Sequence, residues 1–305
     1  MLLEPNAPAA GAIAPPSPRL QRARGAARIA IADDGGRGRL DALHQSGCLK
    51  LRLPRVPVGR PREAVLINTA GGLTGGDRLA IAARVGDGAR LMLASQTAER
   101  LYRAVDGEAR VTVRLEAGEG ARLAWLPQET IAFEGSALHR TLEVDLAPTT
   151  RFLAVESLAL GRLAMGERVS RARYRDDWRV RIGGRLVHAE SLRLGPEVGG
   201  WVARAATLGA NAALATVLYI GPDATHHVAP VRALVGDAGA ADAHDRAPRL
   251  IARLVAPDAM ALRQRLVPVL DRLAAAAMGH SQSGGDPLGC EANGQGSALP
   301  AVWSL

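Results

Sequence analysis

A short glycine-rich stretch combines backbone freedom with a carboxylate. It reads Gly71-Gly72-Leu73-Thr74-Gly75-Gly76-Asp77, and such glycine pairs permit close approaches that other residues cannot make. The turn could offer backbone N–H groups to a phosphate or another anion. A phosphate-binding loop, however, needs Lys and Ser or Thr after the last glycine, and Asp77-Arg78-Leu79 follows here. The spacing also differs from the dinucleotide fingerprint, and the Asp77 carboxylate would repel an anion.

We therefore interpret this stretch as a turn between two strands, because apolar residues 64–67 precede it and residues 78–85 alternate in polarity after it. We predict that Gly72 or Gly75 has a backbone conformation closed to other residues, so that valine there costs about 1 to 3 kcal/mol and gives insoluble protein. An enzyme or binding protein that uses the turn for a small anionic ligand is the alternative.

Other reactive residues lack the neighbours that catalysis or tight metal binding requires. Gly-x-Ser-x-Gly is absent, and Cys48 and Cys290 form neither a Cys-x-x-Cys pair nor a disulfide framework. His226 and His227 are adjacent, and on a strand adjacent side chains face opposite ways. The sequence therefore predicts neither a catalytic constellation nor a permanently bound cofactor.

Five sequence blocks occur in the order typical of one family. They are Leu66–Asp77, Ala98–Arg103, Leu123–Ile131, Glu156–Arg162 with Gly166-Glu167, and Leu299–Trp303. Together they span residues 66–303 and resemble the UreD (UreH) family of urease accessory proteins. The chain departs from that pattern at Asn68-Thr69-Ala70, where many relatives have His-Pro-Pro, and at Ala301, where they have Arg. The first departure removes a potential imidazole ligand.

The resemblance implies a maturation chaperone that is not an enzyme. Such a protein scaffolds the GTPase UreG and the adaptor UreF on the urease apoprotein, and it conducts Ni²⁺ transiently into the urease metallocentre. GTP hydrolysis would then belong to a partner, because Lys and Ser or Thr are missing after Gly76. A scaffold without an ion path is a second alternative.

Four carboxylates of the matched blocks are candidates for a nickel path. They are Asp77, Glu129, Glu156 and Glu167, and we expect each at the end of an apolar strand. In one interpretation each caps a turn or pairs with an arginine such as Arg78 or Arg162. In the other they line a hydrated passage, since Ni²⁺ accepts carboxylate and water oxygens and must be held weakly enough to be released.

The remaining motif residues are candidates for partner contacts or for the core. They are Tyr102, Arg103, Trp125, Gln128, Arg162 and Trp303. Tyr and Trp are enriched in interfaces, but in a chain with only 3% aromatic residues a buried ring is the commoner case. We therefore expect Tyr102 and Trp125 in the core.

The period of hydrophobic residues predicts a mainly β protein. Short alternating segments recur from Ala26 to about Ser191, with Gly183-Gly184 as a hairpin turn. Beyond Leu208 we expect a helix near residues 229–235, a strand at residues 250–255, and a helix at residues 258–278 capped by Asp258 and stopped by Gly279. The resemblance implies a stacked, β-helix-like layered sheet with a few helices in the C-terminal third, which the strand pattern permits alongside a sandwich or barrel.

Composition limits the class of protein. Residues 1–25 are rich in Pro, Ala and Gly and suggest a flexible arm, and residues 26–305 a single domain with a polar Gly/Ser-rich loop at 279–297. The net charge of +8 is compatible with nucleic-acid binding, but the arginines are scattered and no basic run with interleaved aromatics occurs, so we predict none. Without a signal segment or an 18-residue apolar run, we expect a cytoplasmic protein that does not contact membranes.

Overall fold

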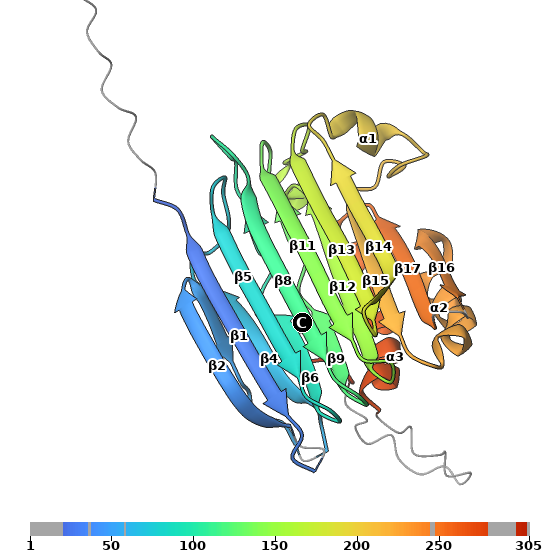
Figure 1. The fold of residues 1–305 in the computed structure, drawn as a ribbon. Helices are drawn as coiled ribbons and strands as arrows, with labels where there is room; N and C mark the ends of the chain where they lie inside the picture. Colours follow the sequence, from blue (N-terminus) through green and yellow to red (C-terminus); the bar gives the residue numbers. More distant parts are fainter. Residues whose placement is uncertain (1–20, 36–37, 58, 245–247, 280–296, 304–305) are drawn as a thin grey trace, which may run out of the picture.

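Two stacked β-sheets form the body of the protein in this computed structural model, which describes residues 21–35, 38–57, 59–244, 248–279 and 297–303 (Figure 1). The front sheet has seven strands in the order β14 (Arg185–Leu194), β13 (Arg173–Ile182), β11 (Ala137–Leu146), β8 (Ala109–Ala117), β5 (Arg78–Val85), β1 (Arg24–Ala32) and β2 (Arg39–Gly47). The rear sheet has the order β16 (Gly239–His244), β17 (Arg249–Ala256), β15 (Ala213–Ile220), β12 (Arg151–Leu160), β9 (Arg122–Leu126), β6 (Arg90–Ser95), β4 (Arg62–Asn68) and β3 (Leu49–Arg52). The short strands β7 (Glu99–Leu101) and β10 (Thr130–Ala132) pair with each other, and β10 also pairs with β12.

The chain coils between the sheets. From β4 to β13 each turn of the chain contributes one strand to the rear sheet and the next to the front sheet, and neighbouring strands of the two central runs are parallel and in register. This coil is the predicted β-helix-like layered architecture. Tertiary stacking, rather than the alternation within any one strand, distinguishes it from a sandwich or barrel.

Alternation within each strand decides what faces the core. In β5 the residues Leu79, Ile81, Ala83 and Val85 are buried, whereas Arg78 and Arg84 are exposed on the opposite face. The core between the sheets is built mainly from Leu, Ala, Val and Ile side chains.

Two helices, α2 (Val228–Val235) and α3 (Ala259–Met278), pack on the rear sheet, whereas the short helix α1 (Gly199–Ala203) lies at one end of the sheets after β14 (Figure 1). The 3₁₀ turns are η1 (Leu163–Met165), η2 (Ala224–His227), η3 (Gly236–Ala238) and η4 (Ala301–Trp303). The predicted caps of α3 are confirmed, because the Asp258 side chain accepts from Ala261 N at 2.8 Å and Gly279 is left-handed. The α3 stripe that includes Leu266 and Leu270 packs on the rear sheet within a second apolar cluster.

Some sequence expectations need correction. The first strand begins at Arg24, inside the predicted arm, since Arg24 already pairs with Arg78 of β5. His226 and His227 lie in η2 and not on a strand, so the argument from strand geometry does not apply to them. Residues 1–20 and 280–296, most of the predicted arm and loop, fall outside the described residues. No helix among the described residues is long and apolar enough to span a membrane.

The glycine turn carries the chain from β4 in the rear sheet to β5 in the front sheet. Gly72 has φ +152°, and a Cβ there would lie 2.4 Å from the Tyr102 ring. Gly75 has no positive φ; its constraint is space, because a Cβ would lie 2.1 Å from the carbonyl oxygen of Asp106. Both glycines are therefore required by close approach of the next segment of chain.

We expect Gly75→Ala to lower the free energy of unfolding by about 1 to 3 kcal/mol, because the Asp106 backbone must move to admit the methyl group. Chemical denaturation of the purified variant measures this loss. Gly200→Ala is the control, since a Cβ at Gly200 meets nothing within 4 Å and the backbone there is not left-handed. Equal stability of the two variants would show that the turn tolerates the methyl group.

Candidate functional site

Three charged side chains meet in the core between the two sheets. Arg140 of β11 donates to Asp176 of β13 through Nε at 3.0 Å and Nη2 at 2.7 Å, and it forms an ion pair with Glu156 of β12 in the opposite sheet. All three are nearly inaccessible, with exposed fractions of 4 to 6%. We call Arg140, Glu156 and Asp176 the interior cluster.

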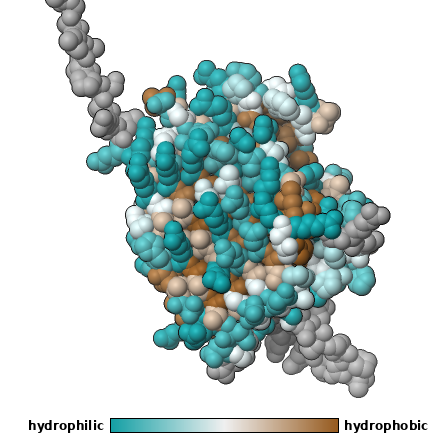
Figure 2. All heavy atoms as spheres, in the orientation of Figure 1, coloured by the Kyte–Doolittle hydropathy of each residue, from teal (hydrophilic) through white to brown (hydrophobic). Residues whose placement is uncertain are grey.

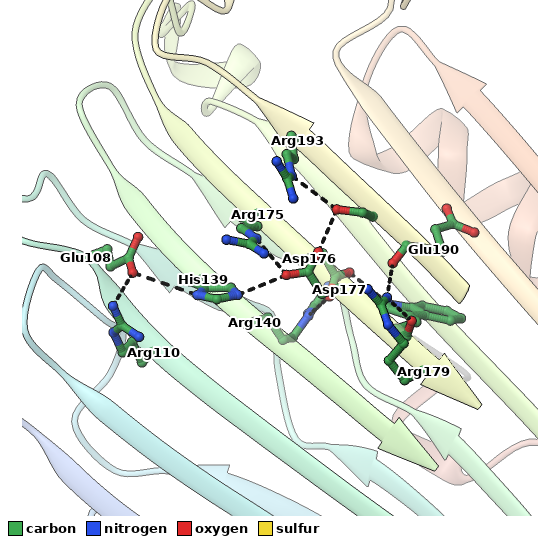
Figure 3. A network of polar contacts seen from close by, with 12 residues as sticks. Glu108, Arg110, His139, Arg140, Arg175, Asp176, Asp177, Arg179, Glu190 and Arg193 are labelled. Atoms are coloured by element: carbon green, nitrogen blue, oxygen red, sulfur yellow. Dashed lines mark hydrogen bonds and ion pairs between the residues drawn. The ribbon is translucent and has the colours of Figure 1, made fainter. Parts of the chain in front are cut away.

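Aromatic donors hold the carboxylates of this cluster. Trp125 donates its Nε1 hydrogen to Glu156 Oε1 at 2.8 Å, and Trp178 donates to Asp176 Oδ2 at 3.1 Å. Figure 3 shows Arg140 and Asp176 together behind the polar residues of the front sheet. Parallel pairing places Arg140 beside Asp176, and the stacking of β12 behind β11 adds Glu156.

The interior cluster holds two carboxylates against one guanidinium. Burial raises the pKa of Glu156 to about 7, although Arg140 opposes that shift and Asp176 adds to it. Burial also acts to lower the pKa of Arg140, but Asp176 and Glu156 together hold that pKa above its ordinary value. When Glu156 is ionised the cluster carries a net charge of −1, so it attracts a cation.

A second acidic group lies between the cluster and solvent. Glu156, Asp176, Thr216 and Glu190 of β14 line one small cavity of about 10 Å³, which is near the size of a single water molecule. Glu190 accepts from Thr216 Oγ1 at 3.3 Å and pairs with Arg253 at 2.9 Å, and the Arg253 side chain is 63% exposed. Polar groups therefore lead from Glu156 past Glu190 to the exposed Arg253 side chain of β17.

The four predicted carboxylates do not form one site. Asp77 caps the glycine turn, accepting from Ala23 N and Thr74 N at 2.8 Å each. Glu167 binds Arg162 at 2.7 Å, and Glu129 lies 3.8 Å from Arg263 and lines an open cavity of about 600 Å³. The described residues contain no group of three or more His, Cys, Asp or Glu that could hold a metal ion.

Their expected placement at strand ends is wrong for two of them. Glu156 occupies the middle of β12, and its side chain is buried in the core between the sheets. Glu167 follows η1 in a loop, where it also accepts from the Glu134 backbone at 3.3 Å. Apolar residues lie on both sides of Glu156 in the sequence. This pattern does not tell a carboxylate in the middle of a strand from one at the end of a strand.

The aromatic motif residues differ in burial. Trp125 is 3% exposed, as expected for a core ring. The prediction that Tyr102 lies in the core is wrong: it is 42% exposed and packs edge-on against Phe133 beside the glycine turn. Arg103 is also exposed, and its carbonyl accepts from Thr74.

The remaining motif residues, Gln128, Arg162 and Trp303, make contacts that join loops to the sheets and to α3. Gln128 and the carbonyl oxygen of Trp303 both accept from Arg263 of α3, at 2.7 and 3.0 Å. The Trp303 indole donates to Leu126 O at 3.0 Å, and the Arg162 guanidinium lies 4.4 Å from the centre of the Phe133 ring. These contacts give Gln128, Arg162 and Trp303 a structural role within the protein. Their contacts with partner proteins stay a prediction.

Sequence reasoning missed Arg140, Asp176 and Glu190. The signal was present, because Arg140 occupies the same face of β11 as Leu138 and Leu142, and Asp176 the same face of β13 as Tyr174 and Trp178. A charged residue at an inward position of a strand indicates a buried partner of opposite charge.

Glu99 is a further buried carboxylate, beside the glycine turn. Asn68 donates to both of its oxygens at 3.1 and 3.2 Å, so the residue that departs from the family pattern has a structural partner. Burial raises the pKa of Glu99 to about 7 despite these donors.

We expect Glu99 to make stability pH-dependent. Its folded pKa lies above the ordinary value of 4.5, so its contribution is full below pH 4.5 and is lost as pH rises through 7. The full effect is up to about 3 kcal/mol, and Glu99→Gln should remove it. Denaturant unfolding at pH 5 and pH 7.5 measures the slope, with the exposed Glu116→Gln as control. An unchanged slope in Glu99→Gln would contradict the assignment.

Comparison with known proteins identifies the family to which the chain belongs. The family described as UreD urease accessory protein matches residues 23–284. The chain belongs to the UreD family. It is 47% identical over 288 residues to urease accessory protein UreD 1 of Brucella melitensis, covering 94% of this chain and 95% of the relative. It is 45% identical over 290 residues to UreD of Mesorhizobium japonicum, covering 94% of this chain and 96% of that UreD.

Proposed function

We propose that this UreD chain acts in urease maturation as a chaperone without catalytic activity of its own. It scaffolds the adaptor UreF and the GTPase UreG on the urease apoprotein, and Ni²⁺ passes through it to the metallocentre as cargo. Membership of the UreD family supports the maturation role. The named partners follow from the resemblance of the five sequence blocks.

The interior cluster is the feature of the structure that best supports a nickel path. A buried site with two carboxylates and one guanidinium has one negative charge in excess, which either a proton on Glu156 or a passing cation can offset. We take Glu156 as the interior step of the path, and Glu190 lies between it and the exposed Arg253 side chain. Asp77, Glu129 and Glu167 stay candidates for other steps, although each is already held by structural contacts.

The alternative of an anionic ligand at the glycine turn has little support. Five of the seven backbone N–H groups of the turn already donate to acceptors within the protein: those of Gly71, Leu73, Thr74, Gly76 and Asp77. A cradle for a phosphate needs several free donors.

Maturation of purified urease apoprotein tests the proposal. With UreF, UreG, GTP and Ni²⁺ present, addition of this chain should raise the nickel content of urease, and the chain should co-purify with urease. Isolated chain titrated with Mg-GTP should show no binding in the calorimeter, because GTP dependence belongs to the partner. Nickel loading that is the same without the chain, or micromolar GTP binding by the chain itself, would contradict the proposal.

A further inference from the structure

Basic residues form one row across the outer face of the front sheet. Strand pairing joins Arg24 of β1, Arg78 of β5, Arg110 of β8, His139 of β11, Arg175 of β13 and Arg193 of β14 as successive neighbours. We call these six residues the arginine row. Adjacent strands lie about 4.8 Å apart, so the row runs roughly 24 Å across the sheet.

The fold itself gives no reason for such a row. Like charges on directly neighbouring strands destabilise a sheet, and the five arginines of the row are all exposed. Arg110 pairs with Glu108 at 2.8 Å and Arg175 with Asp177 at 2.6 Å, as Figure 3 shows. Within the described chain, Arg24 and Arg78 have no side-chain hydrogen bond or ion pair, so one end of the row carries uncompensated charge.

The face that bears the row is open. Helix α3 packs on strands of the rear sheet, while Figures 1 and 2 show the front sheet uncovered and its surface largely hydrophilic. The two aromatic side chains of β13, Tyr174 and Trp178, are buried, and the other strands of this sheet have no Phe, Trp or Tyr.

We propose that the arginine row is a docking surface for an acidic α-helix of a partner protein. Carboxylates one helical turn apart recur every 5.4 Å, close to the strand spacing, so a helix lying across the strands places one Asp or Glu near each arginine. The inference goes beyond the proposed function and rests on charge complementarity alone.

A protein helix fits this face better than a nucleic acid. Stacking of single-stranded bases needs exposed aromatic rings, which the outer positions of these strands lack. Glu143 and Asp145 lie on the same face further along β11, and Glu116 further along β8. Because Glu143 pairs with Arg114 and Glu116 with Arg84, this part of the face has balanced charge and attracts a broad phosphate backbone less than the row does. The basic strip suits a narrow acidic element.

Binding of a synthetic peptide tests the docking surface. The probe is a labelled alanine-based helix with Glu spaced alternately four and three residues apart, which keeps the carboxylates on one face, and the control peptide has Gln in place of Glu. Anisotropy with the full chain at low salt should show binding of the Glu peptide only, and that binding should weaken with added salt. Arg24→Glu with Arg78→Glu should weaken it at least tenfold.

The matched control changes the same number of charges elsewhere on the front sheet. Arg84→Glu with Arg185→Glu lies at the opposite ends of β5 and β14 and should change affinity less than threefold. Far-UV circular dichroism and melting temperature confirm that both double variants fold. Equal loss in both, no binding of the Glu peptide, or DNA that binds as tightly as the peptide and depends equally on the row would each overturn the proposal. None of these readouts depends on nickel, so their failure is separate from failure of the maturation role.

Discussion

Urease matured with the Glu156→Gln variant should contain about tenfold less nickel per active site than urease matured with the wild-type chain. Glutamine keeps the shape of the side chain and can still accept from Trp125, but it removes the charge that offsets dehydration of Ni²⁺ inside the core. High external nickel should partly restore loading, because mass action compensates for a weaker relay.

The complex with urease and the accessory proteins should persist in this variant, since Glu156 is only 5% exposed and cannot contact a partner. The matched control is Glu143→Gln, a substitution on the outer face of β11 where the carboxylate pairs with Arg114. Metal analysis of urease and a pull-down of the complex are measured together. Normal nickel loading, or loss of loading only with loss of the complex, would favour a scaffold without an ion path.

The same experiment has a defined pH dependence. Because the pKa of Glu156 is about 7, the wild-type side chain is largely ionised above pH 7 and loses its charge as pH falls. The difference in nickel loading between wild type and Glu156→Gln should therefore be large at pH 8 and small at pH 6. A constant difference would argue against the charge as the cause.

Arg140→Met should destabilise the fold by about 3 to 5 kcal/mol, the largest stability effect we expect in this protein. Arg140 is the cation that faces both Glu156 and Asp176, and its removal leaves two buried carboxylates without an ionic partner. Thermal and denaturant unfolding measure the loss. Arg114→Met, which removes an exposed guanidinium from Glu143, should change stability by less than about 1 kcal/mol.

Two further results check the cause of this loss. Arg140→Met should regain stability at acid pH, because protonation neutralises the carboxylates, and Arg140→Met combined with Glu156→Gln should be more stable than Arg140→Met alone. A variant as stable as the wild type would mean that the carboxylates are already neutral at the working pH.

Much of the fold was determined by local sequence. Alternating residues in β5 predict a strand with one buried face, Gly183-Gly184 predicts the hairpin between β13 and β14, and Asp258 and Gly279 predict both ends of α3. These features depend on neighbours within a few positions, where backbone propensity and capping act. The five sequence blocks likewise indicate the UreD family without reference to the fold.

Only the tertiary structure decided which charges meet. Arg140, Glu156 and Asp176 are separated by 16 and 20 positions in the chain, and the coil of parallel strands brings them together across two sheets. The arginine row arises in the same way, since no two of its members are sequence neighbours and only strand register aligns them. The local sequence determines which side chains lie on each face of a strand. The pairing and stacking of strands that are distant in the sequence then determine which of those side chains contact each other.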